Sequence, residues 1–181
     1  ASRVVAEILP LLRERIVPGV TTGEIDALVA ALLKQHGAKS PFLGYPHNDG
    51  GPRFPRFSCV SVNEELVHGI GSKRALKEGD IVTVDVGAIV DGWIGDSAWT
   101  FAVGKVSAET QKLLDVTRDA LYMGIEQAKA GKRVGDIGHA VESYVKQFGY
   151  SVVREYVGHG VGRKMHEEPQ LPNYGPPGRG P

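Results

Sequence analysis

The sequence predicts a single α+β domain built from two similar halves, each with two helices followed by strands. Three observations support this prediction: a capped amphipathic helix near the start, an Asp-Gly turn between two strand-like runs, and an internal repeat in which Gly19 falls on Gly131. A chain of 181 residues has the size of one ordinary domain. We therefore expect one domain over residues 1–181.

Two helices are expected at the start of the chain. Apolar residues recur at helical spacing from Val4 to Leu12, and Pro10 is expected to kink or end this first helix. Thr21 and Glu24 form a capping box ahead of an apolar stripe. Gly37 is placed to end this second helix.

Strand-like sequence follows a loop at 40–57. Residues 58–62 and 81–90 are apolar or alternating and rich in β-branched side chains, as strands are. The dipeptide Asp91-Gly92 is a strong hairpin signal. We therefore expect 81–90 to pair antiparallel with 93–103.

The second half repeats the first. Helices are expected at 107–130 and 134–148, and residues 19–37 laid on 131–149 give seven identities in 19 positions. After the second copy the chain has 32 residues, which end in a tail rich in proline and glycine. The second half is therefore expected to be cut short relative to the first.

Composition disfavours several classes of protein. Lys plus Arg (21) equals Asp plus Glu (21), so the net charge is zero and nothing favours a nucleic acid partner. No apolar run approaches the roughly 18 residues of a membrane span. The chain start lacks the layout of a secretion signal, and the single cysteine, Cys59, has no internal disulfide partner. We expect a cytoplasmic protein with Cys59 packed in its interior.

Asp85 and Asp96 are the first candidates for chemistry. If the Asp-Gly dipeptide forms a two-residue loop, Gly87 faces Asp96, and Asp85 lies on the same face. The carboxylates are then diagonal neighbours about 5 to 8 Å apart, and they repel unless a proton or cation lies between them. Either this face is simply solvated, or a divalent metal ion binds there. Gly87 and Gly95 favour the second reading, because they leave room for a ligand or another backbone.

Histidines supply the other candidates. His159 stands among glycines and His166 follows seven residues later, so both are expected on tightly turning backbone. Histidine is a common metal ligand and a donor that can stabilise an oxyanion. His68, next to Gly69, has a similar setting. The remaining histidines are interpreted as having no chemical role: His36, His47 and His139.

Three motifs in order along the chain resemble those of the type I methionine aminopeptidases, which have the pita-bread (creatinase/aminopeptidase) fold. They are the run from Asn63 to Ile70 (NEELVHGI), Asp85 followed eleven residues later by Asp96, and the run from Tyr156 to Tyr174 (YVGHGVGRKMHEEPQLPNY). The resemblance implies pseudo-twofold helix-helix-strand halves around a mostly antiparallel curved sheet, with the second half truncated in this chain.

The resemblance also implies roles for particular residues. The ligands of two divalent metal ions (Co, Mn, Fe, Zn or Ni) would be Asp85, Asp96 and His159. His68 and His166 would contact the substrate and assist catalysis. The pocket for the methionine side chain would be lined by Tyr45, Cys59 and Met165. A water activated by the metal ions would then remove the N-terminal methionine when the second residue is small.

Three departures from the family pattern affect these expectations. Met165 stands where the family frequently has an aromatic residue, and the loop 47–56 is expected to alter the rim of the pocket. The family has two further metal-binding glutamates on strands beyond its signature, and this sequence ends before them. We therefore expect little or no turnover by these 181 residues unless more chain follows.

The implied partners are the N-termini of nascent polypeptides at the ribosome, with no recognition of nucleic acid sequence and no membrane. A complete protein is expected to be a monomer. Two alternatives remain open: a related peptidase of the aminopeptidase P or prolidase kind, which cleaves before proline, and a non-catalytic pita-bread protein that binds peptides or proteins.

Overall fold

The structure is a computed structural model that describes residues 1–46 and 50–181. His47 and the start of the loop 47–56 lie outside the described residues. The chain divides into two compact units. The first comprises Ala1–Ser107 with Gly162–Met165, and the second comprises Ala108–Val161 with His166–Pro181. The expectation of one domain stays a prediction, and each unit is described by itself.

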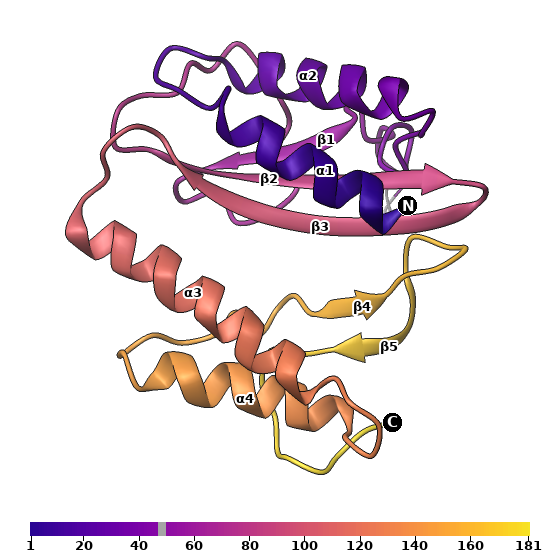
Figure 1. The fold of residues 1–181 in the computed structure, drawn as a ribbon, viewed down its shortest axis with the longest axis vertical. Coiled ribbons are helices and arrows are strands. Elements are labelled where there is room, and N and C mark those ends of the chain that lie inside the picture. Colours follow the sequence, from indigo (N-terminus) through magenta and orange to yellow (C-terminus); the bar gives the residue numbers. More distant parts are fainter. Residues whose placement is uncertain (47–49) are drawn as a thin grey trace. The chain divides into compact units, whose positions relative to one another are not determined.

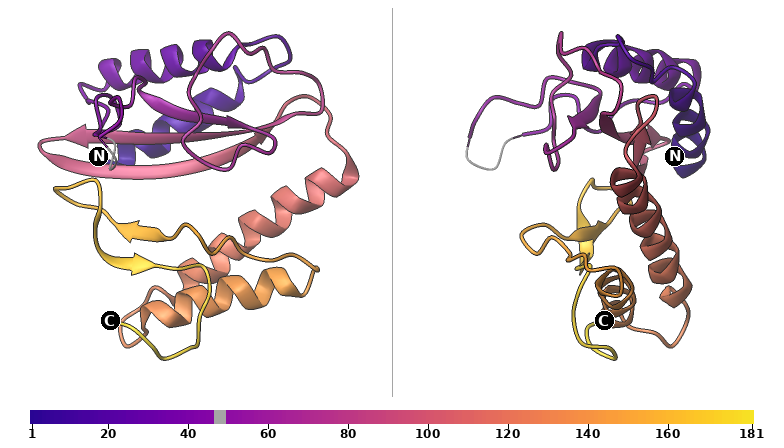
Figure 2. Two further views of the ribbon diagram at one scale, coloured as in Figure 1. Left: turned by 180° about the vertical axis from the view of Figure 1, so that it is seen from behind. Right: turned by 90° about the vertical axis from the view of Figure 1, so that its left-hand side faces the viewer.

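The first unit is an antiparallel sheet with two helices on one face (Figures 1 and 2). Strands β1 (Ser58–Val62), β2 (Ile81–Val90) and β3 (Trp93–Ala102) lie in the order β1-β2-β3. Helices α1 (Ser2–Arg13) and α2 (Thr22–Gln35) pack on the sheet. Alternate residues of β2 are fully buried in the core between helices and sheet, namely Val82, Val84, Val86 and Ala88.

The second helix is capped as its sequence predicts. The backbone N–H of Thr21 donates to Glu24 Oε2 at 2.8 Å, and the N–H of Glu24 donates to Thr21 Oγ1 at 3.2 Å. Gly37, with φ of 63°, ends the helix. The first helix runs through Pro10 to Arg13, so of the two outcomes expected at Pro10, a kink or an end of the helix, the end is wrong. Its buried apolar face continues past the proline and holds the last turn in place.

The hairpin is formed in the predicted register. Val90 pairs with Trp93 and Gly87 with Asp96. Asp91 and Gly92 have φ values of 51° and 77°, the conformation of a type I′ two-residue loop. The side chains of Asp85 and Asp96 therefore fall on one face.

The second unit contains two helices and a short two-stranded sheet. Helices α3 (Ala108–Gln127) and α4 (Val134–Lys146) pack together, and β4 (Gly158–Gly160) pairs antiparallel with β5 (Glu167–Leu171). The buried core of this unit is small: Val116, Ala120 and Val145, with Val141 and Tyr144 packed against them. Both helices are present as predicted, and they end two or three residues earlier than expected.

The internal repeat is visible in the backbone. Equivalent glycines before and after the second helix of each copy have positive φ: Gly19 and Gly131 (94° and 87°), Gly37 and Gly149 (63° and 81°). The N-cap bond of Thr21 to Glu24 has its counterpart in Arg133, whose N–H donates to Asp136 Oδ2 at 2.8 Å. The two copies therefore share local structure as well as sequence.

Two different segments of the chain bind the start of α2 and the start of α4 in the same way. The N–H groups of Thr22 and Gly23 donate to the carbonyls of Arg74 and Ser72, and those of Val134 and Gly135 donate to the carbonyls of Pro181 and Arg179. The tail 172–181 is therefore the counterpart, in the second unit, of the loop that carries His68 in the first.

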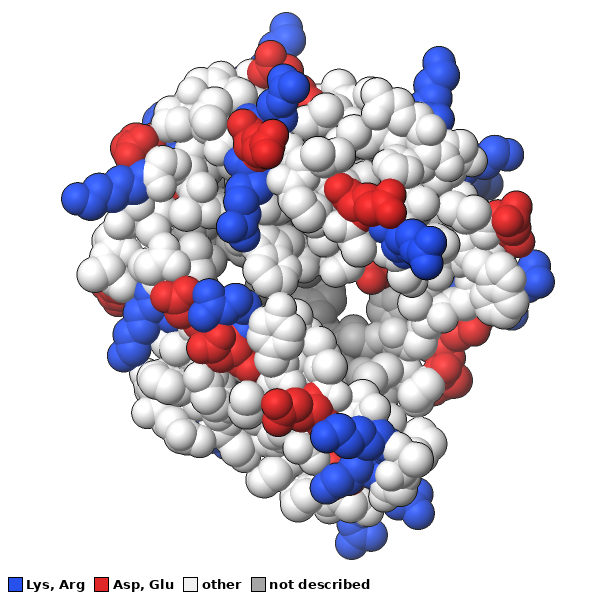
Figure 3. Space-filling model, viewed as in Figure 1, with Lys and Arg blue, Asp and Glu red and all other residues white. Residues whose placement is uncertain are grey.

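No helix within residues 1–46 and 50–181 is both long and apolar enough to cross a membrane. Acidic and basic side chains are interspersed over the face drawn in Figure 3, with no large area of one sign.

Candidate active site

Asp85 and Asp96 lie on the face of the β2–β3 hairpin that faces away from the helices. Asp85 is opposite Ala98 and Asp96 is opposite Gly87, so the two carboxyls are diagonal neighbours, as predicted. Both side chains are half-buried. The antiparallel ladder between β2 and β3 fixes the spacing of the two acids before any ligand arrives.

The environment of this pair favours a proton or a cation. Burial, together with the charge of Asp96 and a hydrogen bond with its side chain, raises the pKa of Asp85 to about 8. Atom Oδ1 of Asp96 is buried. Two hard carboxylate donors held together at a site with too little water to solvate both charges fit a divalent cation, which would replace the shared proton.

The glycines beside the pair leave room for protein atoms. A Cβ on Gly95 would lie 2.5 Å from the backbone nitrogen of Ser2, so this glycine lets the start of α1 pack on the sheet. A Cβ on Gly87 would lie 2.9 Å from Pro41 Cδ and 3.0 Å from Phe42 Cε1. The sequence left open whether a ligand or another part of the chain fills the space beside these glycines. In the structure, other parts of the chain fill it.

The three predicted pocket residues all belong to the first unit. Cys59 is opposite Asp85 in the sheet and is 6% exposed, which confirms its predicted burial. Burial and, next, the charge of Asp85 raise the pKa of the Cys59 thiol to about 12, so it is a neutral apolar lining group. Tyr45 and Met165 are half-buried. The loop of Tyr45 is closed by the N–H of Phe54, which donates to the Tyr45 carbonyl at 3.0 Å.

His68 occupies a strained position in the loop after β1. Its φ is 59°, in the left-handed region that few non-glycine residues adopt. Gly69 fastens the loop to β1: its carbonyl accepts from the N–H of Val60 at 2.9 Å, and its N–H donates to Ser61 Oγ at 3.1 Å. Backbone strain at a candidate catalytic residue is typical of functional sites that the surrounding structure holds in place.

Gly69→Ala is expected to displace His68. An added Cβ would meet the Val60 carbonyl oxygen and lie 2.8 Å from Ser61 Oγ, so we expect unfolding to become easier by about 1–3 kcal/mol. Denaturant unfolding of this variant measures the effect. Val67→Ala, at an exposed site of the same loop, is the control and should change stability little. Equal stability of Gly69→Ala and the unaltered chain would show that the loop is not held in this way.

His159 and His166 are neighbours in the second unit. Their ring centroids are 4.2 Å apart. His159 Nδ1 donates to the Gly160 carbonyl at 2.9 Å, which leaves Nε2 as the nitrogen with the lone pair that a metal ion requires. His159 lies on β4 and His166 directly precedes β5. The expectation of tightly turning backbone at His159 is therefore wrong. The glycines on either side of it belong to strand β4, where the lack of a side chain lets β5 pair closely.

The structure groups the predicted residues into two sets. Asp85, Asp96 and Cys59 lie together in the first unit, and His159 and His166 lie together in the second. Within residues 1–46 and 50–181 no group of three or more His, Cys, Asp or Glu side chains is arranged to hold a metal ion. The ligand set implied by the resemblance stays a prediction.

Two other histidines take part in ordinary surface contacts. His36 Nδ1 is 3.5 Å from Glu7, and His139 Nε2 is 3.3 Å from Ser143 Oγ. Neither contact involves a predicted site residue.

Asp26 supports the site and was not singled out from the sequence. It is 5% exposed, and its Oδ1 accepts hydrogen bonds from the N–H groups of Phe57 and Ser58 and from Ser58 Oγ, each at 2.9 Å. It thereby fixes the start of β1, the strand that carries Cys59. The signal in the sequence that could have indicated this role is the presence of a carboxylate next to Ile25, on the apolar side of α2.

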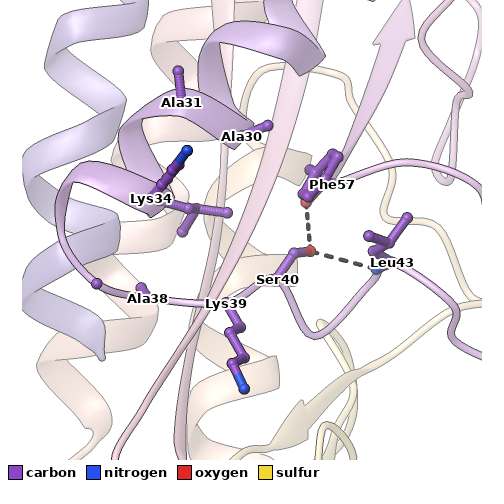
Figure 4. A pocket seen from close by; sticks show the side chains of 10 residues that line it. Ala30, Ala31, Lys34, Ala38, Lys39, Ser40, Leu43 and Phe57 are labelled. Atoms are coloured by element: carbon purple, nitrogen blue, oxygen red, sulfur yellow. Dashed lines mark hydrogen bonds between the residues drawn. The ribbon is translucent and has the colours of Figure 1, made fainter.

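A groove of about 640 Å³ lies at the end of α2 (Figure 4). Its lining includes Lys34, Lys39, Leu43 and Phe57, and one wall is fixed by Ser40, whose Oγ donates to the Phe57 carbonyl at 2.7 Å. None of the predicted site residues lines this groove, so its volume does not locate the candidate active site.

Comparison with known proteins identifies the family. Residues 1–180 match the model of metallopeptidase family M24. The chain belongs to this family. A protein named methionine aminopeptidase from Clostridium acetobutylicum is 50% identical over 182 residues, which cover all of this chain and 70% of that protein. Methionine aminopeptidase 1 from Bacillus subtilis is 49% identical and covers all of this M24 chain and 71% of its own length.

Solved structures agree. A methionine aminopeptidase from Thermotoga maritima superposes with a TM-score of 0.93 at 46% identity, over 99% of this chain and 70% of that one. A prolidase from Pyrococcus furiosus has a TM-score of 0.80 at 24% identity, over 96% of this chain and 49% of that one, and shows the shared fold alone. The pita-bread prediction is thus confirmed, and the chain spans about 70% of the length of its methionine aminopeptidase relatives.

Proposed function

We propose that this M24 chain is a metal-dependent methionine aminopeptidase, which removes the N-terminal methionine of nascent polypeptides whose second residue is small. The observation that carries the proposal is the pair of half-buried acids, Asp85 and Asp96, held by the hairpin register in a chain of this family. A pair that favours a cation at this position has a direct use in a metallopeptidase and none in a protein that merely binds peptides.

Asp85, Asp96 and His159 would hold divalent ions. When bound, such ions lower the pKa of water and polarise a carbonyl group, so that hydrolysis proceeds at neutral pH. The hydrogen bond from His159 Nδ1 to the Gly160 carbonyl orients the imidazole and fixes the tautomer that can act as a ligand.

The other site residues would act on the substrate. His166 would donate a hydrogen bond to the carbonyl oxygen of the scissile bond, where negative charge develops. His68, held at a fixed φ by the anchored Gly69, would orient the peptide. Tyr45, Cys59 and Met165 would enclose the methionine side chain, and the neutral thiol of Cys59 suits an apolar pocket.

The deciding experiment measures free methionine released from the peptide Met-Ala-Ser. Residues 1–181 are assayed with Mn²⁺ or Co²⁺ and with a chelator, both by themselves and, if the gene encodes a longer chain, as the complete product. We expect the complete product to release methionine and the chelator to abolish this release, because bound divalent ions would activate the attacking water. Absence of release from both would overturn the proposal in favour of the non-catalytic alternative.

Two substrate controls separate the remaining enzyme alternative. Leu-Ala-Ser tests the methionine pocket, and an Xaa-Pro dipeptide tests prolidase-like activity. We expect neither to be cleaved at an appreciable rate. The proline-cleaving alternative is disfavoured because the prolidase structure is less similar to this chain than the methionine aminopeptidase structure is.

The substrates would be the N-termini of new polypeptides as they leave the ribosome, which places the protein in the cytoplasm. The number of metal ions would be two, with Co, Mn, Fe, Zn or Ni as candidates. The complete protein would act as a monomer.

A further inference from the structure

The segment Gly162–Met165 lies against the tip of the β2–β3 hairpin. The N–H of Ile94 donates to the Gly162 carbonyl at 2.8 Å. On the opposite edge of the hairpin the N–H of Ile89, which faces Ile94, donates to the Lys39 carbonyl at 2.7 Å. Both N–H groups thus point outward from the hairpin, as expected for a pair that exchanges no bonds with each other. The N–H of Ile94 is therefore available to this segment, and the Gly162 carbonyl accepts its hydrogen bond.

A side-chain contact reinforces this backbone bond. The guanidinium carbon of Arg163 lies 4.4 Å from the centroid of the Trp93 ring, within the range of a cation–π interaction. A Cβ on Gly92 would lie 3.0 Å from Arg163 Nη1, so the glycine of the turn lets the guanidinium come close. Gly162 and Arg163 together therefore contact three consecutive residues of the hairpin tip, 92–94.

This segment connects two groups of candidate site residues along the chain. Asp96 lies two residues after Ile94, on the hairpin itself. His159 lies three residues before Gly162, and His166 directly follows Met165. Both histidines belong to the second unit, whereas the four residues between Val161 and His166 belong to the first. The segment 162–165, which contacts the hairpin, thus begins and ends within a few residues of the two histidines.

We propose that Trp93 and Arg163 are positioning residues of the peptidase. Their contact fastens residues 162–165 to the hairpin that carries the acid pair and thereby restrains the chain next to His159 and His166, which would contact metal ion and substrate. This inference rests on the proposed function. Neither residue touches reacting atoms, so the contact acts through the histidines at the two ends of the segment.

The test is a double-mutant cycle on Co²⁺ binding by the chelator-treated chain. The variants are Arg163→Gln, Trp93→Ala and both together, and visible absorption of Co²⁺ reports its affinity and ligand geometry. We expect each single change to weaken binding about two- to fivefold, since an exposed cation–π contact of about 0.5–1 kcal/mol converts to that factor. The double variant should bind no more weakly than the single ones, because all three lack the same contact.

Conservative variants and a matched pair separate positioning from general stability. Arg163→Lys and Trp93→Phe keep a cation over a ring and should restore most of the affinity. Arg154, which lies 4.3 Å from the Tyr174 ring in the second unit, is the control. Arg154→Gln should lower the unfolding temperature and leave Co²⁺ affinity unchanged. In the active protein, Arg163→Gln should lower kcat for Met-Ala-Ser and change KM less than twofold.

Two results would overturn this inference in distinguishable ways. If the unaltered chain binds no Co²⁺ and the complete product releases no methionine, the proposed function fails and this inference with it. If the unaltered chain binds Co²⁺ and the Arg163 and Trp93 variants bind equally well or lose only stability, the inference alone fails.

Discussion

Asp96→Ala is expected to abolish metal-dependent release of methionine by any active form of the protein. Asp96 is one of two acids that the hairpin holds on the same face, and its Oδ1 is buried. Loss of a partner that merely orients a metal ligand typically costs about 10- to 100-fold in metal affinity or activity. Loss of a ligand itself should exceed that, so we expect release of methionine from Met-Ala-Ser to fall by more than about 100-fold at saturating Mn²⁺ or Co²⁺.

The matched control is Asp115→Ala, which removes an exposed carboxylate from α3 in the second unit. This variant should retain the unaltered rate. Calorimetric titration with Mn²⁺ adds a second measurement, in which Asp96→Ala should lose binding while Asp115→Ala keeps it. Undiminished turnover by Asp96→Ala would remove the two-metal mechanism.

Local sequence signals predicted the part of the site that depends on one hairpin. The Asp-Gly dipeptide fixes a two-residue loop, and the loop fixes which residues are opposite each other, so the diagonal placement of Asp85 and Asp96 followed from counting along the strands. The capping box at Thr21 likewise set the start of α2. Such features depend on neighbours a few residues apart.

Features that depend on distant partners could not be predicted. His159 lies on a strand because β5 pairs with it, and the adjacent glycines alone suggested a turn. Pro10 remains inside α1 because the buried side of that helix is held by the sheet. Asp26 caps the start of β1 across 32 residues of sequence, a contact that no spacing rule indicates. In each case tertiary packing overrides a local preference.

The metal-free chain is expected to lose stability as the pH rises from 5 to 8. The pKa of Asp85 is raised in the folded state to about 8, above the usual 3.8, because burial and Asp96 disfavour its charged form. The folded state therefore holds a proton that the unfolded state has already released. The contribution of this proton to the free energy of unfolding is complete below about pH 4. It disappears as the pH rises toward 8, at up to about 1.4 kcal/mol per pH unit.

Acids with lowered pKa values do not change the stability between pH 5 and 8. Glu24, Asp80, Asp136 and Glu142 have their pKa values lowered mainly by hydrogen bonds, so the stability that they contribute is lost only at more acid pH. Urea unfolding in chelator between pH 5 and 8 therefore reports chiefly on the acid pair among the carboxylates.

Asp85→Asn is the variant that isolates this effect. It removes both the titrating proton and the repulsion with Asp96, so its urea midpoint should fall less between pH 5 and 8 and should exceed that of the unaltered chain at pH 8. Added Mn²⁺ should stabilise the unaltered chain at pH 8 and leave Asp85→Asn nearly unchanged, because a cation relieves the repulsion only where both carboxylates are present. Parallel pH profiles for the two proteins would show that Asp85 and Asp96 do not interact strongly, and the case for a cation at this pair would fail with them.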